Sequence, residues 1–149
     1  MTPQRILQLS RVFLRVALGI TFLISICDRF GWLGPNGSRN VSWGDWSHFT
    51  QYVATLNWFA PKALIPALSG VETIIETALG LALLLGIYPR IVAWSSAALL
   101  SSFALTMSVA LGVVAPLSYS VFTAAAGALL LGCVAAPQPV REQRAAPSA

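Results

Sequence analysis

The chain has 149 residues, of which 56% are hydrophobic and only 9% are charged. A soluble domain carries about 25% charged residues, so this composition argues against a soluble enzyme, and the apolar content excludes a disordered chain. The net charge of +4 comes from nine basic and five acidic residues scattered along the chain, a pattern that does not point to nucleic-acid binding. We therefore expect a protein that is embedded in lipid.

Four segments are long and apolar enough to cross a bilayer, which takes about 20 residues per helix. Pro89 and Pro116 mark short turns after the second and third segments, and short turns make neighbouring helices antiparallel. The predicted fold is all-α: an antiparallel, up-down four-helix transmembrane bundle in one domain, residues 1–136, with a disordered cytoplasmic tail at 137–149. The expected spans are residues 12–30, 63–88, 91–115 and 117–136.

The basic residues predict the orientation, because Lys and Arg favour the cytoplasmic side of a membrane. The side that holds both termini and the Pro89 turn has six arginines, and the opposite side has Arg29, Arg39 and Lys62. We expect a multi-pass protein of the bacterial inner membrane with both termini in the cytoplasm. The bulky, charged residues after the first apolar run offer no signal-peptide cleavage site, so we expect that helix to be retained. The six arginines are Arg5, Arg11, Arg15, Arg90, Arg141 and Arg144.

The long outer connection after the first span holds four of the five tryptophans, which argues against disorder. Apolar residues recur at helical spacing from Trp46 to Leu56, with Ser42 and Asp45 as candidate caps, so we expect a short interfacial helix. This segment is either an aromatic belt or a lid over a pocket between the spans. The lid residues would be Trp43, Trp46, His48 and Phe49.

His48 is the only histidine of the chain. A metal site built from several histidines, or haem held by two, is therefore not expected within this chain. His48 itself is either an exposed interfacial side chain or a ligand-binding residue.

Glu72 and Glu76 lie inside the second expected span and are four residues apart, so both project from one face of that helix. A carboxylate at this depth costs several kcal/mol unless it is paired or protonated, which makes it a candidate functional group. Ser69, Thr73 and Gly80 extend the same stripe, which we expect to face the bundle interior.

Basic partners for these carboxylates are available on the first span. If Ile20 and Ile75 mark the midpoints of their helices, an arginine side chain can bridge from Arg15 to Glu76 and from Arg29, next to Asp28, to Glu72. These pairs either form a ligand-binding site or fix the register of the helices. Two stripes of small and hydroxylated residues are expected to face this site: Ser95, Ala98, Ser102 and Thr106 on the third span, and Ser120, Thr123, Ala124 and Gly127 on the fourth.

Cys27 and Cys133 fall near opposite ends of antiparallel spans, too far apart for a disulfide, and we expect two buried structural thiols.

Two segments carry a family resemblance. Residues 15–23 read RVALGITFL and precede Asp28-Arg29-Phe30, and residues 76–86 read ETALGLALLLG and precede Tyr88-Pro89-Arg90. Their order and spacing resemble the DoxX-like membrane proteins over about residues 11–133. This chain departs from that family by its Trp-rich outer insertion and by Asp28-Arg29, where many relatives show a single lysine-like charge.

The resemblance implies a role beside membrane redox complexes, since the member that names the family is a membrane subunit of a thiosulfate:quinone oxidoreductase. We therefore predict a quinone-interacting or redox-associated membrane subunit, with a partner redox protein and with quinone as the expected ligand. The alternative is a non-enzymatic protein that binds a lipid or a small apolar molecule, or that scaffolds another complex. Catalysis by this chain alone is not expected, because the sequence offers no nucleophile–base pair, metal cluster or phosphate loop. A homo-oligomer is compatible with either function, the redox-associated subunit or the non-enzymatic binding protein.

Overall fold

The structure, a computed structural model, describes residues 2–135, and within that range all regular structure is helical. Three helices are long and apolar enough to cross a membrane: α1 (Pro3–Arg29), α3 (Ile65–Leu85, preceded by the 3-10 turn η1, Lys62–Leu64) and α4 (Pro89–Leu111). The shorter helices are α2 (Trp46–Leu56), α5 (Val114–Ser118) and α6 (Val121–Val134). The predicted all-helical membrane fold is confirmed, but the fourth continuous span is not.

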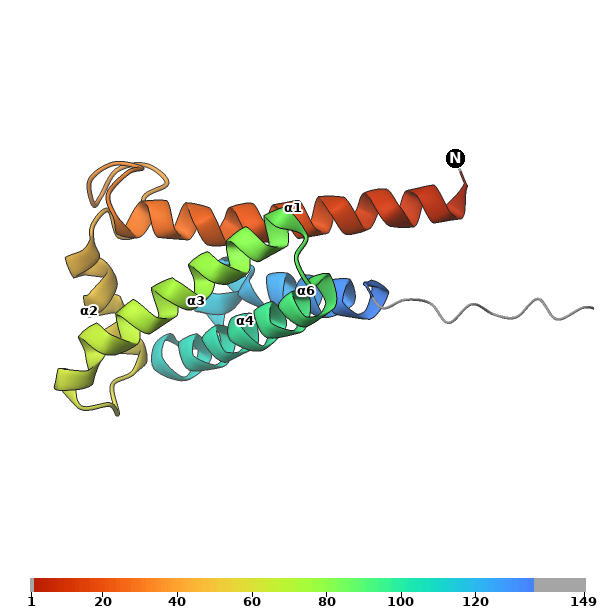
Figure 1. Cartoon of the computed structure of the whole chain (residues 1–149). Coiled ribbons are helices and arrows are strands. Elements are labelled where there is room, and N and C mark those ends of the chain that lie inside the picture. Colours follow the sequence, from red (N-terminus) through yellow and green to blue (C-terminus); the bar gives the residue numbers. More distant parts are fainter. Residues whose placement is uncertain (1, 136–149) are drawn as a thin grey trace, which may run out of the picture.

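The helices associate chiefly as two pairs, α1 with α3 and α4 with α6, and α1 also contacts α6 (Figure 1). Gly19 and Gly80 lie where α1 crosses α3. A Cβ on Gly19 would lie 3.1 Å from the Gly80 carbonyl oxygen, and one on Gly80 would lie 3.1 Å from Phe22 Cβ. Small residues let membrane helices approach closely, so this crossing sets the antiparallel register of α1 and α3.

A single apolar cluster fills the space among α1, α3, α4 and α6. Its fully buried members come from all four helices and are Leu18, Phe22, Leu83, Ala93, Ala97, Leu100, Ala125, Ala128 and Leu131. The alanines of α4 and α6 face each other, which explains why these two helices have the most extensive contact.

Two helices end earlier than expected, and each ends at a glycine that leaves the helical conformation. α3 ends at Leu85 because Gly86 adopts a left-handed conformation with φ of 73°, and α4 ends at Leu111 because Gly112 has φ of 86°. α1 begins at Pro3, nine residues before the expected start at position 12. The predicted tail, residues 137–149, lies outside the described residues.

The expected span at 117–136 is broken. α5 ends at Ser118, Ser120 adopts a left-handed φ of 56°, and α6 begins at Val121. With 14 residues α6 is about 21 Å long, shorter than the roughly 30 Å hydrocarbon core.

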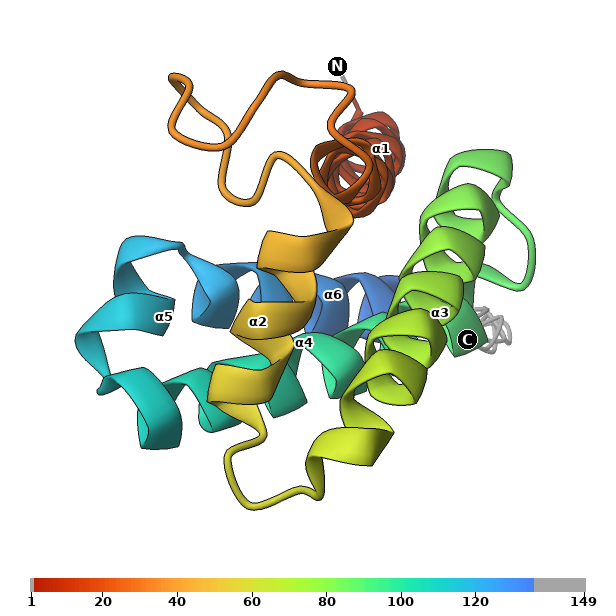
Figure 2. The ribbon, with the colours of Figure 1, turned by 90° about the vertical axis from the view of Figure 1, so that its left-hand side faces the viewer.

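α2 forms where the sequence predicted a helix. Asp45 is its N-cap and accepts a hydrogen bond from the His48 backbone N–H at 2.8 Å, whereas Ser42 is not a cap. Figure 2 shows that α2 crosses the end of the molecule at which α1 finishes and α3 begins. Phe49 and Val53 of α2 pack with Ile65 of α3 in a second apolar cluster, so α2 is fixed to the membrane helices.

The small-residue stripe predicted to face the bundle from α4 does not do so. Ser95, Ala98 and Ser102 are exposed, and the buried face carries Ser96, Ala97 and Ala104 instead. α4 is apolar on every side, so its composition does not distinguish the lipid-facing side from the protein-facing side. On α6 the predicted stripe faces the bundle only in part: Ser120 and Thr123 are exposed and Ala124 and Gly127 are half-buried. The buried residues of α6 are Ala125, Ala128, Leu131 and Gly132.

Candidate functional site

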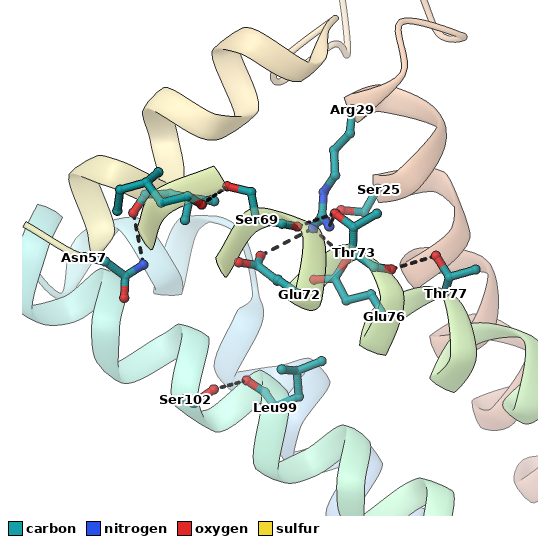
Figure 3. Close-up of polar contacts among 12 residues, drawn as sticks. Ser25, Arg29, Asn57, Ser69, Glu72, Thr73, Glu76, Thr77, Leu99 and Ser102 are labelled. Atoms are coloured by element: carbon teal, nitrogen blue, oxygen red, sulfur yellow. Dashed lines mark hydrogen bonds and ion pairs between the residues drawn. The ribbon is translucent and has the colours of Figure 1, made fainter. Parts of the chain in front are cut away.

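Arg29 is the centre of a polar cluster between the last turn of α1 and the face of α3 (Figure 3). Its Nη2 lies 2.6 Å from Glu76 Oε2 and 3.5 Å from Glu72 Oε1. Nη1 donates a hydrogen bond of 2.9 Å to Thr73 Oγ1, and Nη2 also contacts Ser25 Oγ at 3.3 Å. One guanidinium therefore joins two carboxylates and two hydroxyls.

The two carboxylates are not equivalent. Glu76 is 3% exposed and forms the short bond to Arg29, whereas the Glu72 side chain is 22% exposed and its contact is long. A single positive charge cannot fully compensate two carboxylates. Glu72 is therefore the group that retains capacity to accept a hydrogen bond or a proton from a ligand.

Arg29 itself is 1% exposed and is enclosed by aromatic rings as well as by carboxylates. Its Cζ atom lies 3.9 Å from the ring centroid of Phe49 and 5.4 Å from that of Trp43. These cation–π contacts stabilise the buried charge and join α1 to α2 and to the loop before it. Arg29 Nε is buried and has no hydrogen-bond partner within residues 2–135.

The expected pairing of Arg15 with Glu76 is wrong. The Arg15 guanidinium lies against Gly86, where a Cβ would collide with it, and Gly86 is ten residues, or about 15 Å, beyond Glu76 along α3. The reason is the register: the Gly19–Gly80 crossing differs from an alignment of Ile20 with Ile75 by four residues, or about 6 Å, which moves Arg15 away from Glu76 and brings Arg29 within reach of it. Arg29 thus contacts both carboxylates, including the predicted partner Glu72.

Asp28, next to Arg29, fixes the loop between α1 and α2. Its carboxylate accepts hydrogen bonds from the backbone N–H groups of Ser42 (2.8 Å), Trp43 (3.3 Å) and Gly44 (3.0 Å). Gly44 has φ of 72°, and any Cβ there would collide with the Asn36 backbone, so the turn requires glycine. Asp28 thus fixes the loop that precedes α2, and the adjacent Arg29 fixes the contact of α1 with α3.

A cavity of about 570 Å³ opens beside this cluster. Arg29 and Glu72 supply its charged side, and aromatic and aliphatic side chains supply most of the rest, as is typical of sites for small organic ligands. The lining residues are Arg29, Asn36, Val41, Ser42, Trp43, His48, Tyr52, Leu56, Glu72, Leu100, Phe103, Met107, Tyr119 and Val121.

The predicted lid residues divide into two groups. Trp43 and His48 line the cavity, whereas Phe49 is buried beneath it and Trp46 packs against Phe49 at 5.4 Å between ring centroids. His48 Nδ1 lies 2.8 Å from Asp45 Oδ2. Hydrogen bonds from the backbone N–H and the ring of His48 lower the pKa of Asp45 below its usual value.

The sequence did not identify Tyr52, Asn36, Phe103 or Tyr119 as cavity residues. Tyr52 was detectable, because it lies four residues after His48 and so shares its face of α2. Burial, with smaller contributions from Tyr119 and Glu72, raises the pKa of Tyr52 to about 12. Its hydroxyl therefore remains a hydrogen-bond donor at neutral pH.

Both cysteines are free, as predicted. Cys27 is half-buried, but Cys133 is exposed rather than buried, because it lies on the side of α6 opposite Leu131 and Gly132.

The long apolar helices define an integral membrane protein, and a buried ion cluster and an aromatic-lined cavity lie together at one end of it. Residues 6–115 match the model of the family described as methylamine utilisation protein MauE, a membrane protein family. The match covers well over half of the chain, and the chain belongs to this family. It supports the membrane part of the DoxX-like interpretation, but not DoxX specifically. No curated protein and no solved structure matched the chain.

Proposed function

We propose that this MauE-family protein is a redox-associated membrane subunit that binds a quinone headgroup in the cavity beside Arg29 and Glu72. The observation that carries the proposal is the position of Glu72: a partly exposed carboxylate in an aromatic cavity, beside a guanidinium that is mainly bonded to Glu76. A quinol hydroxyl donates to a carboxylate of this kind, and a quinone carbonyl accepts from a nearby donor such as the Tyr52 hydroxyl.

The chemistry follows from these groups. Reduction of a quinone takes up two electrons and two protons, and reoxidation of the quinol releases them. Glu72 exchanges one of the two protons with the ligand, and water that enters the cavity exchanges the other. Arg29 stabilises the Glu72 carboxylate when its proton leaves. The electrons come from a partner redox protein, as in the DoxX-like subunits that the chain resembles.

The cavity faces the periplasm in this proposal. The opposite end of the described chain carries Arg5, Arg11, Arg15 and Arg90, and Arg29 is enclosed in the ion cluster rather than exposed at the outer surface. This charge distribution favours both termini in the cytoplasm, with α5 and α6 together completing the fourth crossing.

A second candidate is a protein that binds a lipid or another apolar molecule without redox chemistry. Leu56, Leu100, Phe103 and Met107 give the cavity apolar sides that would hold such a ligand equally well. Glu72 would then serve only to orient its polar end.

The test is purification of the full chain from its native membrane in mild detergent, followed by solvent extraction and mass spectrometry. The proposal predicts close to one quinone per chain, and a large reduction in Glu72→Gln. Arg39→Gln, which removes an exposed charge of the loop outside the cavity lining, is the control and should retain the quinone. Stoichiometric recovery of a non-redox lipid would favour the second candidate, and a preparation without any bound molecule would contradict both.

A further inference from the structure

A second cavity lies at the opposite end of the bundle, where α3 finishes, α4 begins and α6 finishes. Its volume is about 330 Å³, and its lining includes Gln8, Arg11 and Arg15 of α1, Pro89 of α4 and Leu131 of α6. The proposed quinone site uses none of these residues.

The cavity is strongly basic. Arg11 and Arg15 are four residues apart and project from the same face of α1. The four acidic residues within positions 2–135 are Asp28, Asp45, Glu72 and Glu76; none of them lines this cavity, and Glu76, at the middle of α3, is bonded to Arg29. The described part of the chain therefore supplies two positive charges here and no carboxylate to compensate them.

Arg15 is held in place but incompletely bonded. Gly86 leaves room for its guanidinium at the end of α3, and a side chain at that position would displace it. Arg15 Nε is buried and finds no hydrogen-bond partner within residues 2–135. A buried donor without a partner is costly, so an acceptor from outside the described chain fits this position.

The cavity also lies at the level along the helices at which a lipid headgroup is expected. The first turns of α1 continue past the ends of α3 and α6 (Figure 1). Arg11 and Arg15 share the cavity lining with Pro89, at the start of α4, and Ala135, just after α6, so the cavity lies at the ends of these apolar helices. Val12 and Leu131 add apolar surface to the lining, next to the charged groups. Acyl chains can therefore lie beside the same helices whose arginines bind the phosphate.

We propose that this cavity binds a phosphate group, carried by an anionic phospholipid whose headgroup contacts Arg11 and Arg15. The same chemistry would accept free inorganic phosphate, so the experiment separates the two sources.

The experiment uses the full chain, delipidated in detergent, and measures binding of phosphatidylglycerol by native mass spectrometry, with phosphatidylcholine and inorganic phosphate in parallel. A basic residue near an anionic membrane contributes enough to change affinity about fivefold, so Arg11→Gln should weaken phosphatidylglycerol binding about fivefold and R11Q/R15Q about twentyfold. Arg5→Gln, on the same end of α1 but outside the cavity lining, is the matched control and should bind as the wild type does. Arg15→Lys keeps the positive charge and should bind phosphatidylglycerol more tightly than Arg15→Gln does. This comparison shows whether weaker binding is caused by the lost charge or by a loss of folding.

Preference for phosphatidylglycerol over phosphatidylcholine that depends on Arg11 and Arg15 supports the lipid source. Competition by inorganic phosphate at similar occupancy supports the phosphate chemistry with a soluble source. Equal phosphatidylglycerol binding by R11Q/R15Q and R5Q overturns the proposal.

Discussion

The Arg29 guanidinium lies 2.6 Å from the Glu76 carboxylate, although the two residues are 47 positions apart in the chain. This contact joins the C-terminal end of α1 to the middle of α3, and the Gly19–Gly80 crossing lies closer to the N-terminus of α1. The ion pair and the close helix contact together fix the geometry of the cavity.

Replacement of Arg29 tests the ion pair. Arg29→Leu leaves two carboxylates without a cation, and loss of one partner of a buried pair costs about 3–5 kcal/mol. We expect the free energy of unfolding in detergent to fall by that amount, and Glu76→Gln in the R29L background to recover part of it. Arg39→Gln, at an exposed loop position, is the control. An R29L protein as stable as R39Q would show that the pair does not stabilise the fold.

Asp28→Ala tests the attachment of the loop. A hydrogen bond to a charged group contributes about 1.5–3 kcal/mol, so backbone amide exchange at Ser42, Trp43 and Gly44 should accelerate at least tenfold. Asp45→Ala is matched to it, because Asp45 caps α2 through the His48 N–H. That variant should accelerate exchange at the start of α2 and leave the 42–44 turn unchanged. Equal exchange at this turn in both variants would contradict the assigned role of Asp28.

The helix crossing is tested by a pair of glycines on α3. A Cβ at Gly80 would lie 3.1 Å from side-chain atoms of Phe22 and Leu23, whereas a Cβ at Gly70 meets nothing within 4 Å. Gly80→Val should therefore lower the unfolding free energy by about 1–3 kcal/mol through overpacking. Gly70→Ala should raise it by about 0.5–1 kcal/mol, since glycine is unfavourable inside a helix. Thermal unfolding of the two variants in the same detergent measures the difference, and a similar effect of both would exclude a close crossing at Gly80.

Tyr52 provides a pH-dependent signature of the cavity. Burial raises its pKa from 10.0 to about 12, so the folded protein binds this proton more tightly than the unfolded chain does. The resulting stabilisation is complete below pH 10 and is lost as the pH rises through about 12. Absorbance titration should show a tyrosinate transition near that upper value in the wild type that is missing in Tyr52→Phe. A Tyr52 transition near pH 10 would mean that the side chain is exposed to water.

The sequence was sufficient to predict the three long helices, α2 and the buried stripe of Ser69, Thr73 and Glu76, because each depends on local periodicity or on the cost of a charge in lipid. The sequence was not sufficient to predict the pairing of Arg29 with Glu76. That contact depends on the register at Gly19 and Gly80, which no periodicity encodes.

The faces of α4 and α6 were not predictable for a different reason. A helix that is apolar on every side has no strong preference for one orientation, so Ala97 rather than Ser102 could be identified as buried only from the packing with α6. The break of the fourth span at Ser120 also has no clear signal, since serine rarely adopts a positive φ.

Trp43 provides the most direct test of the central claim, that the cavity beside Arg29 and Glu72 binds a quinone headgroup. Trp43 lines this cavity, so we would titrate the purified full chain with decylubiquinone and follow quenching of its tryptophan fluorescence. We expect saturable quenching that is lost in Trp43→Phe and unchanged in Trp58→Phe, since Trp58 is exposed and lies outside the cavity. In Glu72→Gln the affinity should fall about tenfold, because a hydrogen bond to a charged group is lost. Linear quenching without saturation, identical in the wild type, W43F and E72Q, would contradict the claim.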